Sequence, residues 1–295
     1  TTTYQLTHHS QLRKRCVRPY LKRKYLAMNR YTSILFVLLA ITSCTKKLTV
    51  NNNYSKPIVS VTLPIEKYFI DRLADTTIMV NVIIPQNVGH SEYTPKPSQI
   101  MAVAKSDIYL AIGHLDFENA WKERLTNGTT IKWIDLDKGI NLIENAEHSG
   151  HHATDPHYWL SPKRVSTMIE NIANELRPLT TFNVDSAKNV LLAEIDLFDK
   201  KLNTIKGDKA FLIYHPALTY LAHDYSLTQL EIEKEGNAPS PITYKNSIDE
   251  ARKMNVKIVF VQQGYDIDKA QSAADMIGAK VVTISPENYK WHQTR

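Results

Sequence analysis

Short apolar runs rich in β-branched residues alternate with stretches of helical period along most of the chain. This alternation predicts parallel sheets flanked by helices, because the crossover between two parallel strands usually contains a helix. We therefore expect an α/β fold with two lobes, each a mainly parallel four-stranded sheet flanked by helices, joined by one long spine helix. The predicted strands span residues 58–63, 78–84, 108–113, 131–136, 210–215, 227–233, 256–262 and 280–285.

The longest helical pattern lies between the fourth and fifth predicted strands, from about Asp185 to Ile205. A stripe of this length needs apolar surface on both sides of a boundary to bury it. We therefore predict a first lobe over 57–182, a spine helix over 183–207 that ends at Gly207, and a second lobe over 208–295. One eight-stranded sheet is the alternative. The apolar positions of the stripe are Leu191, Ile195, Phe198, Leu202 and Ile205.

The first 56 residues are typical of an export leader and a tether. From Met28, a positive start, a short apolar core over 34–41 and small residues lead to Cys44. We expect an upstream extension or tag over 1–27, a lipoprotein signal peptide over 28–43, lipidation at Cys44 and a tether over 44–56. The protein would then be exported and anchored in a membrane on its periplasmic or cell-surface side. An ordinary signal peptide with a chance cysteine is the alternative.

The net charge of +6 does not indicate a nucleic-acid partner, because the positive charge is concentrated in the leader. The first 43 residues contain eight of the 36 basic residues and none of the 30 acidic ones. The remaining chain has 28 basic and 30 acidic residues, a net charge of −2. A mildly acidic body lacks the basic surface that binding to phosphates requires.

The chemistry of the body depends on histidine and carboxylate side chains. The two cysteines, Cys16 and Cys44, lie in the first 50 residues, so the body has no thiolate for a metal site. His90, His157 and His215 follow predicted strands or lie in loops above them. Ligands of open parallel sheets bind at this edge, so the three histidines together indicate a three-imidazole site.

Four segments, in this order, resemble the cluster A-I solute-binding proteins of bacterial zinc and manganese ABC importers. The resemblance runs from about Pro57 to the end of the chain. It implies two α/β lobes on one rigid helix, with a metal ion bound in the cleft and delivered to a membrane permease, and no enzymatic activity. The segments are 93–99 (YTPKPSQ), 155–162 (DPHYWLSP), 214–217 (YHPA, followed by Tyr220 and Tyr225) and 233–241 (EKEGNAPSP).

The resemblance gives the metal ligands directly at His157 and His215. The first histidine of the family normally lies two residues before the motif tyrosine, where this chain has Ser91. His90 is one residue earlier, and Glu92 is a competing donor. We expect His90 to be the third ligand.

The fourth ligand of the family is often an aspartate in the last loop, where this chain has Ser285. We expect Glu287 to take this place, with water as the alternative. Relatives usually continue through a further helix after this loop, so we also expect a truncated C-terminus.

Three imidazoles and one oxygen donor favour Zn²⁺ over Mn²⁺, which prefers more oxygen ligands. Protons compete for the same nitrogens, so we expect binding to weaken below about pH 6.5. His148, His151 and His152 form a small histidine-rich loop before His157. This loop is either an auxiliary collecting site, to which Glu92 could contribute, or an ordinary solvated loop.

Two other function classes fit the same histidines. A zinc-dependent hydrolase could use Glu92 or Glu118 as a general base. A lipid-anchored adhesin could use the metal for stability alone. Against the hydrolase, the chain contains no His-Glu-x-x-His, Gly-x-Ser-x-Gly or P-loop pattern.

Overall fold

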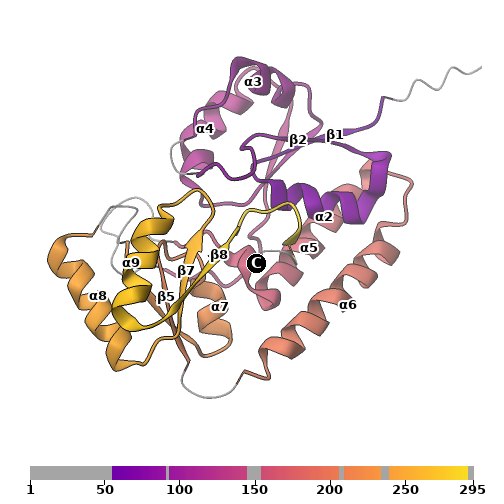
Figure 1. The fold of residues 1–295 in the computed structure, drawn as a ribbon. Coiled ribbons are helices and arrows are strands. Elements are labelled where there is room, and N and C mark those ends of the chain that lie inside the picture. The colour runs from indigo at the N-terminus through magenta and orange to yellow at the C-terminus, as the bar shows by residue number, and fades with distance from the viewer. Residues whose placement is uncertain (1–54, 91–92, 145–153, 206–208, 234–238, 292–295) are drawn as a thin grey trace, which may run out of the picture. The chain divides into compact units, whose positions relative to one another are not determined.

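Two parallel four-stranded sheets form the centre of the structure, a computed structural model that describes residues 55–90, 93–144, 154–205, 209–233 and 239–291 (Figure 1). The first sheet has the order β2-β1-β3-β4 and the second has the order β6-β5-β7-β8. The predicted α/β class with two parallel sheets is confirmed, and the single eight-stranded sheet is wrong. The strands are β1 (Ile58–Val61), β2 (Met79–Val82), β3 (Ile108–Ala111), β4 (Lys132–Asp135), β5 (Ala210–Ile213), β6 (Thr228–Glu231), β7 (Ile258–Gln262) and β8 (Lys280–Ile284).

Helices connect successive strands. Four of them, α2, α3, α5 and α8, have proline in their first turn, where the missing N–H removes no helical hydrogen bond. In the described residues, no helix is both long and apolar enough to span a membrane. The α-helices are α2 (Pro64–Ala74), α3 (Pro97–Val103), α4 (Asp116–Thr126), α5 (Pro162–Leu176), α6 (Val184–Leu202), α7 (Thr219–Asp224), α8 (Pro241–Lys253) and α9 (Ile267–Ile277), and the short 3-10 helices are η1 (Asp75–Thr77), η2 (Tyr158–Leu160) and η3 (Arg177–Leu179).

In both sheets the strand order changes direction between the two inner strands. These are β1 and β3 in the first sheet, and β5 and β7 in the second. The crevice beyond the carboxyl ends of such strands is the usual ligand site of open α/β sheets. The segments that contain His90 and His215 come after β2 and β5 in the chain, at this edge of the sheets.

The first lobe has the larger core. Its inner strands are buried on both faces, and even Ser60 is inaccessible, with its hydroxyl 2.7 Å from the Ser106 hydroxyl. The second lobe has one smaller cluster on each face of its sheet. Ala217, Tyr220 and Trp291, which lie after β5 in the chain, nevertheless pack in the core of the first lobe. These residues connect the two lobes.

Helix α6 differs from the predicted spine. It begins after Asn183, whose side chain accepts from the Ser186 N–H, and it ends at Leu202, before Gly207, which lies outside the described residues. Leu191 and Ile195 are buried against the first lobe, where α6 packs on α2 and α5.

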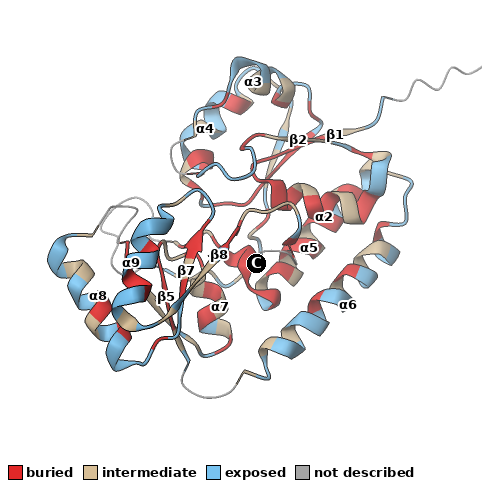
Figure 2. Ribbon diagram, viewed as in Figure 1, coloured by how far each residue is buried: buried red, intermediate tan, exposed pale blue. Residues whose placement is uncertain are grey.

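The second half of the predicted apolar stripe is not buried against the second lobe. Phe198 is 39% exposed, and α6 is pale blue over much of its length (Figure 2). The stripe is buried less completely than we expected, because α6 packs mainly on helices of the first lobe. The residue limits that we gave for the lobes and the spine stay predictions.

The segment after β8 returns to the first lobe. The Trp291 ring packs against Phe69 and Phe198, with centroids 6.4 and 5.5 Å away. Its indole N–H donates to the Trp159 carbonyl at 2.7 Å. The Tyr289 hydroxyl donates to Asp71 at 2.6 Å. We call residues 285–291 the C-terminal strap.

Candidate metal centre

His157 is fixed by the carboxylate two residues before it. Asp155 Oδ1 accepts from the His157 backbone N–H and lies 2.8 Å from His157 Nδ1. Burial favours protonation of this carboxyl, but the adjacent His157 and its hydrogen bonds keep the pKa of Asp155 below its ordinary value. An ionised Asp155 assigns the ring proton to Nδ1, which leaves Nε2 as the available donor.

His215 has the same arrangement with a carboxylate that follows the neighbouring strand. Its Nδ1 lies 2.9 Å from Glu233 Oε2. Strand β5 pairs with β6 so that their last residues, Ile213 and Glu231, lie opposite each other, and His215 and Glu233 each come two residues after these strand ends. His215 Nε2 is buried without a hydrogen-bond partner among the described residues. This nitrogen is the second available donor.

His90 lies beside these two histidines and is 9% exposed. Its Nδ1 has no hydrogen-bond partner in the described part of the chain, and its Nε2 is 3.8 Å from Glu287 Oε1. Burial, followed by the nearby His157 and His215, lowers the pKa of His90 to about 3. His90 is therefore neutral at physiological pH, which is the protonation state that binds a metal. The expected loss of binding near pH 6.5 does not come from this ring.

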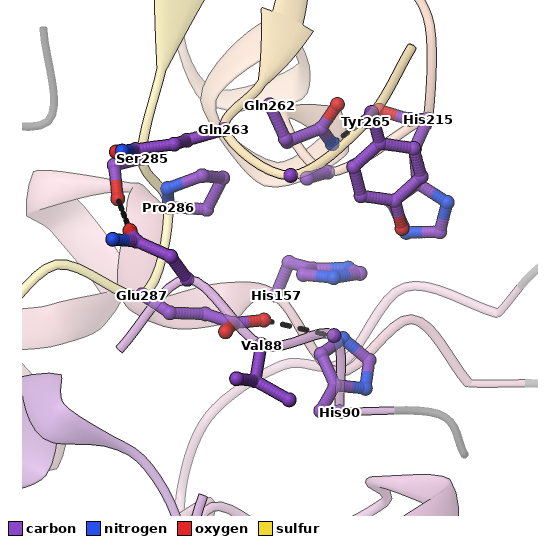
Figure 3. Close-up of a pocket in the computed structure, with 14 residues that line it drawn as sticks. Val88, His90, His157, His215, Gln262, Gln263, Tyr265, Ser285, Pro286 and Glu287 are labelled. Atoms are coloured by element: carbon purple, nitrogen blue, oxygen red, sulfur yellow. Dashed lines mark hydrogen bonds and ion pairs between the residues drawn. The ribbon is translucent and has the colours of Figure 1, made fainter. Parts of the chain in front are cut away.

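The three rings surround a common pocket (Figure 3). The His157 centroid lies 5.5 Å from that of His90 and 5.5 Å from that of His215. Tetrahedral zinc with Zn–N bonds of about 2.0–2.1 Å requires imidazole centroids roughly 5 Å apart. As they stand, no three His, Cys, Asp or Glu side chains in the described residues could hold a metal ion. The separations of His157 from the other two rings are close to this value, but the donor atoms do not converge on one point in this arrangement.

Glu287 approaches the histidines from the C-terminal strap. Burial raises the pKa of Glu287 to about 7, opposed by the nearby His157. The indole N–H of Trp159 donates to the Pro286 carbonyl at 3.0 Å, which connects the segment of His157 to that of Glu287. The pocket has a volume of about 220 Å³, so it can admit an ion with some of its water.

Comparison with known proteins gives the family. The family model described as "Zinc-uptake complex component A periplasmic" matches residues 59–290. The chain belongs to this family. It is therefore a solute-binding protein of metal transport by ABC systems, as the sequence motifs indicated.

Individual relatives agree with this assignment. The "High-affinity zinc uptake system protein ZnuA" of Bacillus subtilis is 25% identical over 70% of each chain. A "Metal ABC transporter substrate-binding lipoprotein" of Lactococcus lactis is 23% identical over 81% of this chain and 83% of the relative. A crystal structure of a ZnuA deletion mutant with zinc bound is 32% identical, with a TM-score of 0.72, and covers 81% of this chain and 93% of that one.

Glu118 is the remaining sequence candidate in the described part of the chain, and it does not line the pocket. His148, His151, His152, Glu92 and Cys44 lie outside the described residues. Glu118, one of the two bases considered for a hydrolase, instead accepts backbone hydrogen bonds from Ile112 and Gly113 in the first lobe.

Sequence analysis assigned no role to Asp155 or Glu233. Asp155 could have been found, because it lies in the same short motif as His157. Glu233 lies 18 residues after His215, and its role depends on the register between β5 and β6. That register is not visible in the sequence.

Proposed function

We propose that this protein captures Zn²⁺ in the pocket and delivers it to the membrane permease of an ABC importer. The ligands in this proposal are His157 and His215 through Nε2, together with His90 and Glu287. One observation carries the proposal: His157 and His215 each have Nδ1 at hydrogen-bond distance from a carboxylate, which leaves Nε2 of both rings for the pocket.

The donor set supports zinc as the cargo. Neutral imidazoles suit Zn²⁺, and the low pKa of His90 keeps that ring neutral without an ion present. A bound divalent cation favours the ionised form of Glu287, whose proton is then released on binding. The B. subtilis relative is named as a zinc uptake protein, and the crystal structure of the ZnuA deletion mutant has zinc bound. Mn²⁺ is the competing cargo, with a preference for more oxygen donors.

The contacts between the lobes support capture by small movements. The C-terminal strap contacts the first lobe through Tyr289 and Trp291, so wide separation of the lobes would break several buried contacts. In this proposal, the donors come together by rotation of the ligand side chains and a small movement of the strap around Glu287.

The test is isothermal titration of the purified protein with Zn²⁺ and with Mn²⁺. We expect tighter binding of Zn²⁺, and at least a tenfold loss of zinc affinity in His157→Ala and in His215→Ala. His114→Asn is the matched control, because His114 lies outside this pocket, 2.9 Å from Asp137, and asparagine tolerates its positive φ. Unchanged zinc affinity in both alanine variants would contradict the proposed site.

Membrane anchoring through a lipid on Cys44 is a separate part of the proposal. It is supported by the short apolar core and the small residues before Cys44 and by the lipoprotein name of the L. lactis relative. We expect Cys44→Ala to move the protein from the membrane fraction to the soluble fraction when it is expressed in a bacterium. Retention of the variant in the membrane fraction would contradict the anchor.

A further inference from the structure

Tyr220 lies in α7, the helix that follows His215, yet its side chain is fully buried in the core of the first lobe. Its hydroxyl donates to the Asp155 carbonyl at 2.6 Å and accepts from the Ile143 N–H at 3.0 Å. The ring packs edge-on against Tyr158, with centroids 6.4 Å apart. One side chain of the second lobe is thus fixed by three residues of the first.

These contacts connect the segments of His157 and His215, whose ring centroids lie 5.5 Å apart. Tyr220 comes five residues after His215, and Asp155 comes two residues before His157. Asp155 is also the carboxylate that lies against His157 Nδ1. The Tyr220–Asp155 hydrogen bond is therefore a short path from the backbone of one proposed ligand to the backbone of the other.

Asp224, one helical turn after Tyr220, fixes the other end of α7. Its carboxylate accepts from the Ser161 hydroxyl at 2.6 Å and from Arg164 Nε and Nη2 at 2.8 and 2.6 Å. Burial favours its protonation, but the hydrogen bonds from Arg164 and Ser161 lower the pKa of Asp224 to about 2. The ion pair is therefore present throughout the physiological pH range.

We propose that Tyr220 is a positioning residue that sets the separation of His157 and His215, with the Asp224–Arg164 pair holding its helix in place. This inference rests on the proposed function of the pocket. Zinc ligands have to lie within about 0.2 Å of their ideal distances, so a small shift of α7 lowers affinity. It also weakens the preference for a tetrahedral ion over an ion that accepts six ligands at longer distances.

The test compares Tyr220→Phe with Tyr225→Phe. Both substitutions remove one hydroxyl from the same end of the second lobe and keep the ring. The Tyr225 hydroxyl also donates a long-range hydrogen bond, at 2.6 Å. Its acceptor is Asp199 of α6, which does not line the pocket. The variants are therefore matched in chemistry and differ in their connection to His157.

Three quantities are measured on the purified full chain: zinc affinity by competition with a chelator, the ratio of zinc to manganese affinity, and the visible absorption of the Co²⁺ form. For Tyr220→Phe we expect at least a tenfold loss of zinc affinity, a lower zinc-to-manganese ratio and a weaker tetrahedral Co²⁺ band. For Tyr225→Phe we expect all three to stay within twofold of the parent values. Asp224→Asn, which keeps the shape of the side chain, should change them in the same direction as Tyr220→Phe.

Thermal unfolding of the metal-free variants separates positioning from stability. If Tyr220→Phe lowers the unfolding temperature but keeps the parent's zinc affinity, metal ratio and Co²⁺ spectrum, the inference is wrong and Tyr220 is only structural. If Tyr220→Phe does not fold, Asp224→Asn decides by the same three measurements. Absence of zinc binding in the parent protein would instead refute the proposed function, and the inference with it.

Discussion

At the residue scale, two carboxylates determine which ring nitrogens are available in the proposed metal site. Asp155 and Glu233 each lie against Nδ1 of one histidine, so the opposite nitrogen is the available one. A carboxylate in this position also raises the basicity of the ring nitrogen that binds the metal. We therefore expect zinc binding by His157 and His215 to depend on the adjacent carboxylate as well as on the position of each ring.

Glu233 gives a direct test of this arrangement. We expect Glu233→Gln to lower zinc affinity by about tenfold or more, because the neutral amide neither fixes the tautomer of His215 nor favours positive charge on it. Zinc titration of the purified variant measures the effect. Glu250→Gln, on an exposed position of α8, is the control and should bind zinc as the parent does. Equal affinity of Glu233→Gln and the parent would remove Glu233 from the site.

The sequence predicted the cluster of histidines from topology, because parallel strands bring their carboxyl ends to one edge of a sheet. His90, His157 and His215 do line one pocket. The partners of these rings were not predictable to the same degree. The Tyr220–Asp155 contact joins residues 65 positions apart and depends on the packing of α7 against the first lobe. Periodicity within one element contains no information about such a contact.

At the level of elements, α6 shows how a periodic pattern can overestimate burial. Its apolar positions continue to Leu202, yet the fully buried ones end at Ile195. Periodicity identifies which face of a helix is apolar, but the neighbouring elements decide how much of that face is covered. The strands of the described residues all lie within the predicted ranges, and the inner ones are short apolar runs, such as β3 (IYLA) and β5 (AFLI).

Two neighbouring positions of α6 test this division. Ile195 is 2% exposed and Leu197 is 61% exposed. We expect Ile195→Ala to lower the free energy of unfolding by about 2–4 kcal/mol, because it leaves a cavity against the first lobe. Leu197→Ala should change it by less than about 0.5 kcal/mol. Urea denaturation followed by circular dichroism gives both values, and similar losses in the two variants would show that the exposed face has a partner.

At the scale of the whole molecule, a buried acid of the first lobe, Glu118, makes the stability of the protein depend on pH. Glu118 accepts from the backbone N–H groups of Ile112 and Gly113 and from the Thr62 hydroxyl. Burial raises the pKa of Glu118 to about 7 despite these hydrogen bonds. Burial also raises the pKa of Glu66, and the charge of Glu118 raises it further. The folded state therefore binds protons at these two carboxyl groups more tightly than the unfolded state does.

The sign of the pH dependence follows from the raised pKa. Between the ordinary pKa of 4.5 and about 7, the folded state binds more protons at Glu118 than the unfolded state does. The contribution of Glu118 to the free energy of unfolding therefore falls as the pH rises through this window. We expect Glu118→Gln to remove roughly 1–3 kcal/mol of the difference in stability between about pH 5 and about pH 8. Urea midpoints of the metal-free protein across this range measure it, and an identical pH profile in the variant would show that Glu118 does not titrate there.

The C-terminal strap brings the chain back to the lobe from which it started. The polypeptide enters the first lobe at β1, passes to the second lobe after α6, and comes back with the Trp291 ring between Phe69 of α2 and Phe198 of α6. Glu287 lies on the returning stretch, four residues before that anchored indole. Glu287 is thus held from both directions, because the chain before it forms β8 of the second lobe and the chain after it is anchored on the first lobe. We expect rotation of one lobe against the other to displace this carboxylate.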